Sequence, residues 1–301
     1  MDYFGAIFHY YRMCCCTDSF ISSYTAIGGA GAGRRGGDQD SSVEYIRNHL
    51  REERVKRLGI FKKGFPGGVI IKINSPGGSV TATDIIYHEL MQYKKQTGVR
   101  IVACLTSTAT SGGYYVASVA DEIIAHPTSV TGNIGVIAMK FNVEKFLSKI
   151  GIQEETIKSG EKKDIWSPFR PSTPEEKDII QTIINTLHER FVKVVFAGRQ
   201  PLLSKEEIRK LADGRIFTAD QALEMKLIDR IGYLDDAVEE MKKALKLEDA
   251  KIVTYNRPRS YKGTIYSGLP VTSHKEINLI AINGDGLAAI SGLQFMYLWR
   301  P

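Results

Sequence analysis

Residues 109–115 read Ala-Thr-Ser-Gly-Gly-Tyr-Tyr, and this run places a single serine, Ser111, between two regular elements. The apolar run from Arg100 to Thr106 is typical of a short buried strand, and Tyr114 to Ala120 can continue as a helix. Ser111 would then lie at a helix start, where free backbone N–H groups and the helix dipole favour developing negative charge. Ser111 is therefore a candidate nucleophile, although a serine before a helix more often acts only as an N-cap.

A second glycine-containing turn follows another predicted strand. The strand from Val69 to Asn74 ends in Ser-Pro-Gly-Gly, and a helix is expected from Thr81 to about Gln96. Glycines let backbone N–H groups approach a ligand closely. If this turn faces Ser111, the N–H groups of Gly78 and Gly112 form a two-donor oxyanion hole. A tight turn between a strand and a helix explains the same glycines equally well.

Three lysines lie in a predicted loop further along the chain. Lys158, Lys162 and Lys163 fall between an expected strand, Glu154 to Lys158, and a long helix that begins near Pro174. Taken alone, loop lysines are solvated charges.

In their order and spacing, these segments resemble the signal peptide peptidase A family, which are serine proteases of the ClpP/crotonase superfold that use a Ser-Lys dyad. The resemblance extends from about Gly67 to Tyr255. It rests on six motifs: Asn74-Ser-Pro-Gly-Gly78, Ser111-Gly-Gly-Tyr-Tyr115, Ala120-Asp-Glu-Ile-Ile124, Thr131-Gly-Asn-Ile-Gly-Val136, Lys158-Ser-Gly-Glu-Lys-Lys-Asp164 and Asp213-Gly-Arg-Ile-Phe-Thr218. The resemblance implies an α/β fold of the ClpP/crotonase type, with helices packed around a mixed β-sheet core.

The resemblance also assigns chemical roles. It implies that Ser111 is the nucleophile, that Gly78 contributes to the oxyanion hole and that Lys163 is the general base, with Lys162 as the nearest rival. A lysine with its reference pKa near 10.4 is almost fully protonated at neutral pH, so burial must neutralise the base. Neutral Lys163 would accept the Ser111 proton, and its ammonium form would protonate the leaving amine before water hydrolyses the acyl-serine.

One position departs from the family pattern. The motif usually written Thr-Gly-Ser-Ile-Gly has Asn133 in place of the serine that helps to hold the lysine amine. The amide carbonyl of Asn133 can accept the same hydrogen bond, although the side chain is larger and brings a second donor group. We therefore assign Asn133 a supporting role.

The implied activity is that of a serine endopeptidase that degrades signal peptides and other membrane-released peptides. The resemblance implies peptide substrates, a homo-oligomer whose serine and lysine can come from neighbouring subunits, and a membrane-associated or extracytoplasmic location. The stripe Ile179, Ile183, Leu187 and Phe191 is expected to be core or subunit contact. We assign no cofactor.

Two other functional readings stay open. The first is a ClpP-like Ser-His-Asp triad with His126, which follows Ser111 by 15 residues; a structural or surface histidine is the better reading, as it is for His88 and His188. The second is a non-proteolytic crotonase-type acyl-CoA enzyme or an inactive scaffold, because a fold does not fix its chemistry.

The composition of the chain restricts its possible partners and ligands. The 301 residues are 43% apolar, which is enough for a sizeable core, and the formal charge of +6 is spread along the chain. Dispersed basic residues are weak evidence for nucleic acid, so no nucleic-acid partner is expected. Cys14, Cys15 and Cys16 are adjacent, Cys104 falls in a predicted core strand, and we assign no metal because ligand spacing is absent.

The chain is expected to divide into an N-terminal segment with a Gly-rich linker (1–42), a catalytic domain (43–262) and a C-terminal extension (263–301). Tyr3 to Met13 is too short to cross a bilayer, so no transmembrane segment is visible. Other expected elements are a flexible linker from Ala26 to Asp40, a helix from Val43 to Lys62, and strands from Val130 to Met139 and from Ile277 to Asn283.

Overall fold

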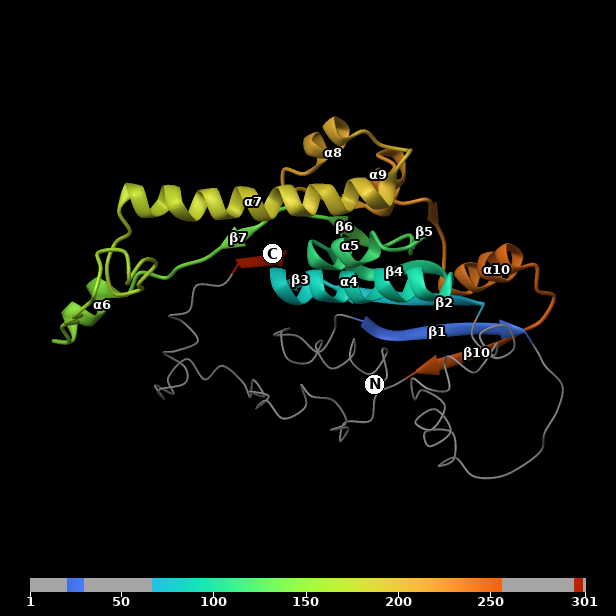
Figure 1. Cartoon of the computed structure of the whole chain (residues 1–301), viewed down its shortest axis with the longest axis horizontal. Helices are drawn as coiled ribbons and strands as arrows, with labels where there is room; N and C mark the ends of the chain where they lie inside the picture. The colour runs from blue at the N-terminus through green and yellow to red at the C-terminus, as the bar shows by residue number, and fades with distance from the viewer. Residues whose placement is uncertain (1–20, 30–66, 256–294, 300–301) are drawn as a thin grey trace, which may run out of the picture.

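The computed structural model describes residues 21–29, 67–255 and 295–299 (Figure 1). Its strands are β1 (Ile21–Gly29), β2 (Gly68–Ser75), β3 (Gly77–Ser79), β4 (Arg100–Thr110), β5 (Glu122–Ala125), β6 (Val130–Gly132), β7 (Ile137–Ala138), β8 (Ile216–Thr218), β9 (Arg230–Ile231), β10 (Ala250–Tyr255) and β11 (Phe295–Leu298). Its helices are α4 (Val80–Thr97), α5 (Gly112–Ala117), α6 (Glu144–Lys149), α7 (Pro174–Arg199), α8 (Lys205–Leu211), α9 (Ala219–Glu224) and α10 (Leu234–Leu245).

The main sheet has the order β10-β1-β2-β4-β5-β9. Its centre is parallel, because β4 pairs in parallel with β2, β5 and β6, while β1 runs antiparallel to β2 and β10. The first half of β4 pairs with β5 and its end pairs with β6, so the sheet forks immediately before Ser111. The predicted α/β fold with a mixed β-sheet core is confirmed.

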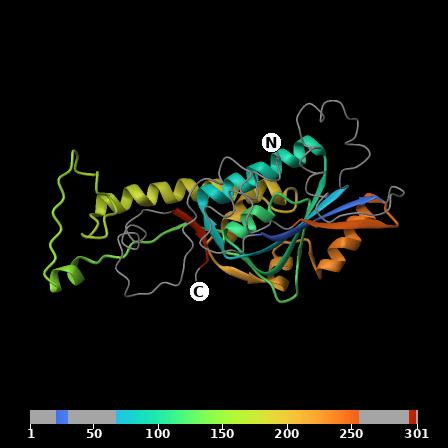
Figure 2. The same cartoon turned by 90° about the horizontal axis from the view of Figure 1, so that it is seen from below.

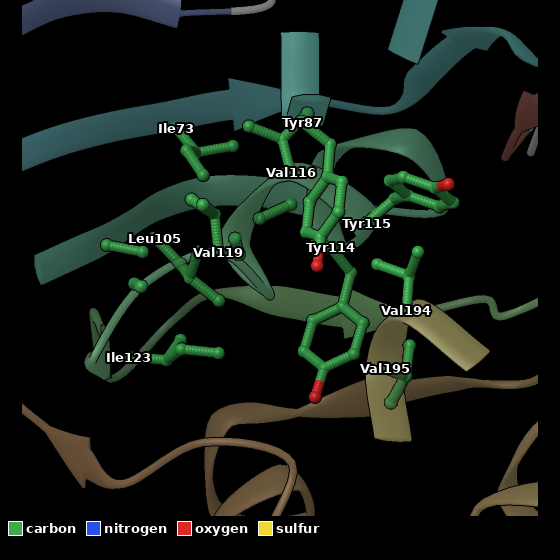
Figure 3. Packing of buried hydrophobic residues seen from close by; sticks show 14 of the residues in the cluster. Ile73, Tyr87, Leu105, Tyr114, Tyr115, Val116, Val119, Ile123, Val194 and Val195 are labelled. Atoms are coloured by element: carbon green, nitrogen blue, oxygen red, sulfur yellow. The ribbon is translucent and has the colours of Figure 1, made fainter. Parts of the chain in front are cut away.

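Both faces of the central strands are covered. Side chains alternate along β2, so Val69, Ile71 and Ile73 join the larger apolar cluster with α4, α5 and α7, and Ile70 joins a smaller cluster with α10. Figure 3 shows residues of β2, β4, α5 and α7 packed together in the larger cluster. This burial on both faces is typical of a parallel sheet, and it fixes the end of β4 in space.

The long helix α7 begins where the sequence predicts. Thr173 and Glu176 form a capping box, and Pro174 occupies the first turn. The predicted apolar stripe divides along the helix: Phe191 is fully buried in the core, whereas Ile179 and Ile183 are each 37% exposed. In the first half of α7, the face that carries this stripe is therefore partly exposed, although Ile180 beside it is buried.

The segment that joins β7 to α7, residues 139–173, is named the arm. Figures 1 and 2 both show it projecting from the sheet and its helices, with α6 near its far end. The expected strand from Glu154 to Lys158 is wrong, because these residues are exposed and pair with no strand in the described structure. A strand without a partner leaves its backbone groups to water.

Two further expectations need correction. The expected strand from Val130 to Met139 is split into β6 and β7, because Gly132 (φ 85°) and Asn133 (φ 52°) turn the backbone. Ala26 to Gly29, which were expected to be linker, form the end of β1. Their small side chains do not prevent this, because pairing with β2 and β10 uses only backbone groups.

Several expectations fall on residues that the structure does not describe. The helix from Val43 to Lys62, the strand from Ile277 to Asn283, the rest of the linker and Cys14 to Cys16 lie outside the described residues. The domain boundaries stay predictions, although β1 and β11 come from the two flanking segments and pair with strands of the predicted catalytic domain. Cys104 is buried as predicted, and burial raises the pKa of its thiol to about 11.

Among the described residues, no helix has the length and apolar character needed to cross a membrane.

Candidate active site

Ser111 occupies a strained turn between β4 and α5. Its backbone has φ 54° and ψ −116°, a conformation that residues with a side chain rarely adopt. Two backbone hydrogen bonds hold it: the Ser111 N–H donates to the Gly132 carbonyl (2.7 Å), and the Tyr115 N–H donates to the Ser111 carbonyl (2.9 Å). Strain that the surroundings enforce is found most often at functional sites, which makes this turn a candidate for one.

The Ser111 side chain has no structural partner. It makes no capping hydrogen bond to α5, so the N-cap reading of this serine is wrong. The residue is 1% exposed, and its Oγ is buried without a hydrogen-bond partner. Since an unpaired buried hydroxyl costs free energy, it suggests a functional role rather than a structural one.

The two predicted oxyanion glycines lie side by side. A Cβ added to Gly112 would lie 3.2 Å from the Gly78 nitrogen and 3.2 Å from the Gly77 Cα. Side chains hold the turn in place: Ser75 Oγ accepts from the Gly77 N–H (3.1 Å), and Asn74 Oδ1 accepts from the Thr108 N–H (3.2 Å). Glycine is favoured here because a Cβ on Gly112 would lie only 2.8 Å from Thr83 Oγ1 and would crowd the backbone of the turn.

Asn133 is fixed by a segment far away in sequence. Its Nδ2 donates to the Gly214 carbonyl (2.5 Å), and its backbone N–H donates to the Arg215 carbonyl (2.7 Å). Two of the sequence motifs, around Asn133 and around Gly214, therefore meet directly. Among the described residues, no hydrogen bond joins this side chain to any of the loop lysines.

Lys163 lies in the arm, exposed and apart from Ser111. The two neighbouring lysines are paired: Lys158 Nζ bonds Asp164 Oδ1 at 2.7 Å, and Lys162 bonds Glu175. Within the described part of the chain, the Lys163 ammonium has neither an ion pair nor a side-chain hydrogen bond, and Ser111 Oγ has no partner. A single chain therefore does not join the predicted dyad.

The loop that carries Lys163 is anchored to the N-terminal end of α7. The Arg170 guanidinium donates to both oxygens of Asp164 (2.8 and 2.9 Å) and also binds Glu176. Hydrogen bonds from Arg170, and for Asp164 a further one from Lys158, hold the pKa of Asp164 well below its usual range and lower that of Glu176 to about 2. This ionic cluster gives an otherwise exposed loop a defined shape.

The histidine alternative receives no support from the geometry. His126 Nδ1 lies 2.9 Å from Thr128 Oγ1, and its ring packs edge-on against Tyr233. His88 is exposed on α4, and His188 contacts the Ala212 carbonyl at 2.8 Å. All three have the surface or packing roles expected of them, and none is bonded to Ser111 Oγ.

Sequence reasoning missed two parts of this site. Thr83 Oγ1 is also buried without a partner, and it would lie 2.8 Å from a Cβ on Gly112; no local pattern marks it. Strand β11 pairs with β3, which contains Gly78, and with β7. The aromatic run from Phe295 to Trp299 was the available signal for this strand.

The chain is similar to a known family of proteins. The model of peptidase family S49 matches residues 93–248, which include Ser111, Asn133 and Lys163. A putative signal peptide peptidase SppA of Enterococcus faecium is 39% identical over 188 residues, covering 62% of this chain and 54% of the relative. A putative protease slr0021 of Synechocystis sp. is 41% identical over 176 residues (58% and 62%), and Protease 4 of Haemophilus influenzae is 37% identical over 170 residues (56% and 27%).

The chain spans less than two thirds of the length of these curated relatives. The family model nevertheless covers more than half of the chain, including the strained serine turn. The chain therefore belongs to peptidase family S49.

Proposed function

We propose that this protein is a serine endopeptidase in which Ser111 is the nucleophile. The observation that carries this proposal is the strained, buried Ser111, whose Oγ has no structural partner. The adjacent backbone of Gly78 and Gly112 supports an oxyanion hole at the same point. Such a pair of N–H groups stabilises the negative charge that develops when Oγ attacks a peptide carbonyl.

Lys163 is the general base of the proposal. It accepts the Ser111 proton during attack, and its ammonium form then protonates the leaving amine. Of the three loop lysines, Lys163 is supported because the amines of Lys158 and Lys162 are already engaged in ion pairs with Asp164 and Glu175. Asn133 keeps a supporting role, since its side-chain oxygen can still accept a hydrogen bond from the incoming amine.

The two dyad residues come from neighbouring subunits of a homo-oligomer. The arm supports this arrangement because it carries large apolar side chains in water: Phe141 is 63% exposed, Phe146 62% and Ile157 96%. Clusters of exposed apolar residues commonly mark interaction surfaces. Contact with a second copy would bury this surface and remove water from Lys163, as a neutral lysine base requires.

The proposed substrates are cleaved signal peptides and other membrane-released peptides, degraded through an acyl-serine intermediate. The name of the Enterococcus faecium relative, a putative signal peptide peptidase, supports this class. The formal charge of +6 is compatible with attraction to anionic lipid surfaces, so a membrane-associated or extracytoplasmic place of action is part of the proposal.

The test is covalent labelling of Ser111. A fluorophosphonate probe should label the wild-type protein at a single residue, identified by peptide mapping as Ser111, and Ser111→Ala should abolish both labelling and casein hydrolysis. Circular dichroism and sedimentation of Ser111→Ala control for folding. Undiminished hydrolysis by folded Ser111→Ala would contradict the proposal and would favour a different nucleophile.

A further inference from the structure

The residue that directly follows the proposed base is an acid, Asp164. A carboxylate beside a lysine favours the charged ammonium form, which cannot accept the Ser111 proton. Within the described part of the chain, however, the Lys163 ammonium has neither an ion pair nor a side-chain hydrogen bond. The arrangement of the arm therefore keeps this acid away from the base.

Both carboxylate oxygens of Asp164 are engaged by other cations. Arg170 Nε donates to Oδ2 at 2.8 Å, and Arg170 Nη2 donates to Oδ1 at 2.9 Å, in the two-pronged geometry that a guanidinium offers a carboxylate. Lys158 Nζ donates to Oδ1 at 2.7 Å. The side chain of Asp164 is only 15% exposed. The carboxylate is thus held in one orientation, with neither oxygen left free for Lys163.

Arg170 is itself held against the N-terminal end of α7. Its Nη1 donates to Glu176 Oε2 at 3.0 Å, and Glu176 is buried, where it completes the capping box with Thr173. Lys140, at the start of the arm, donates from Nζ to the Arg170 carbonyl at 2.7 Å. The guanidinium of Arg170 therefore has a fixed place between Asp164 and α7.

The other acids of this region do not compete for the base in the same way. Glu175 is paired with Lys162, and Glu176 is bound at the start of α7 as described above. Glu161 is exposed to water, where an ion pair contributes little. Asp164, which is adjacent to the base and mostly shielded from water, is therefore the acid whose charge matters most.

The cluster also concentrates positive charge. Burial, followed by the charge of Arg170, lowers the pKa of the Lys140 amine. Removal of Arg170 would take one positive charge out of this part of the arm. It would also leave Asp164 with Lys158 as its single cation, bonded to one of its two oxygens. The second oxygen would then be free to accept a hydrogen bond from Lys163.

We propose that Arg170 is a positioning residue for the base: it occupies Asp164 and thereby keeps this carboxylate from pairing with the Lys163 ammonium. The proposal rests on the serine mechanism above, in which Lys163 must lose its proton before it can receive that of Ser111. Arg170 acts through Asp164 and is not itself a catalytic residue.

The test is a double-mutant cycle in the full-length protein, followed by casein hydrolysis across pH. Arg170→Gln releases Asp164 to pair with Lys163, so the rise of activity should move to higher pH by about one unit, which is about a tenfold loss at pH 7. Asp164→Asn removes the acid and should leave the rise at the wild-type pH or lower. The double variant should regain most of the activity that Arg170→Gln loses.

A purely structural anchor would give a different pattern. Asp164→Asn breaks the same contact with Arg170, so both single variants would lose activity equally and the double variant would not recover; this result would overturn the proposal. Arg170→Lys keeps the charge but not the two-pronged contact. It should shift the rise in the same direction by less, and it replaces Arg170→Gln where circular dichroism shows that variant to be unfolded. Arg209→Gln, which removes a paired arginine of α8 outside the arm, is the matched control and should change nothing.

Chemical labelling of the amine separates this proposal from the serine mechanism. Acetylation of Lys163 by acetic anhydride is mapped by peptide mass spectrometry, with Lys145 of α6 as the internal reference. Its rate should fall about tenfold in Arg170→Gln and recover in the double variant, because an ammonium held by a carboxylate does not react. Unchanged acetylation in Arg170→Gln would overturn the proposal even where Lys163→Ala is inactive. The expected labelling pattern with a fully active Lys163→Ala protein would instead reject Lys163 as the base.

Discussion

Ser111 and Lys163 lie in two regions of opposite physical character. Ser111 is surrounded by the packed sheet and helices, where the fork of β4 and the turn at Gly77 and Gly78 hold it almost free of solvent contact. Lys163 lies in the arm, whose large apolar side chains face water. Under the proposed mechanism, one chain holds the nucleophile in place, whereas the environment that a lysine base needs must come from contact with another surface.

The largest expected effect concerns the arm lysine. Lys163→Ala should lower kcat/KM by about a thousandfold or more, because residues of a dyad act as a unit. Lys162→Ala, one position away and paired with Glu175, is the matched control and should retain most activity. Peptide hydrolysis assays across pH should also show wild-type activity rising with pH, as expected when the base must be neutral. The reverse order of the two variants would move the base to Lys162.

The next effect concerns the turn that holds the proposed oxyanion donors. Gly112→Ala places a Cβ 2.8 Å from Thr83 Oγ1 and 3.2 Å from the Gly78 nitrogen, so the two oxyanion donors must separate. We expect kcat to fall by about a hundredfold, as for the loss of one oxyanion donor. Gly160→Ala, in the arm where a Cβ meets no atom within 4 Å, is the control. Unchanged kcat in Gly112→Ala would remove Gly112 from the oxyanion hole.

A smaller effect is expected on assembly. Ile157→Asp places a charge on the most exposed large apolar side chain of the arm, and it should shift sedimentation towards the monomer and reduce activity in parallel. Leu202→Asp, on an exposed apolar residue outside the arm, controls for a general effect of an added charge. An active, fully assembled Ile157→Asp protein would show that this part of the arm is not an interface.

The smallest effect concerns the contact between Arg170 and Glu176, where the arm joins α7. The Arg170 hydrogen bond lowers the pKa of Glu176 to about 2, from an ordinary value of 4.5. Because the folded pKa is depressed, the stabilisation is complete above pH 4.5 and is lost as the pH falls towards 2. Fluorescence of Trp166 in a Trp299→Phe background should report this acid transition, and Glu176→Gln should lack it. An identical transition in Glu176→Gln would assign it to another group.

The sequence predicts the elements next to Ser111 and Gly78, which are formed by neighbouring residues. Ser111, Gly78 and Gly112 stand out because a strand, a glycine turn and a helix start are encoded within a few residues. Non-local pairing is not encoded in this way: β11 meets β3 across more than 200 residues of sequence, and Asn133 finds its partner at Gly214. The break between β6 and β7 depends on two positive φ angles that an apolar pattern does not reveal.

The arm limits prediction for a different reason. The motif predicts Lys163 as the base, yet the surroundings of this lysine in the proposed oligomer depend on which surface contacts the arm. The structure adds that Lys158 and Lys162 are already paired, a distinction that three loop lysines in a sequence cannot supply.

Mixing two inactive proteins tests the central claim most directly. Full-length Ser111→Ala and Lys163→Ala are each expected to be inactive, and they are combined after dissociation and reassembly. If each site combines the Ser111 turn of one subunit with the arm of another, the mixture should regain partial peptidase activity. Some sites would then contain an intact serine and an intact lysine. Absence of activity in a mixture shown by sedimentation to be co-assembled would contradict the account and place both residues of each site in one chain.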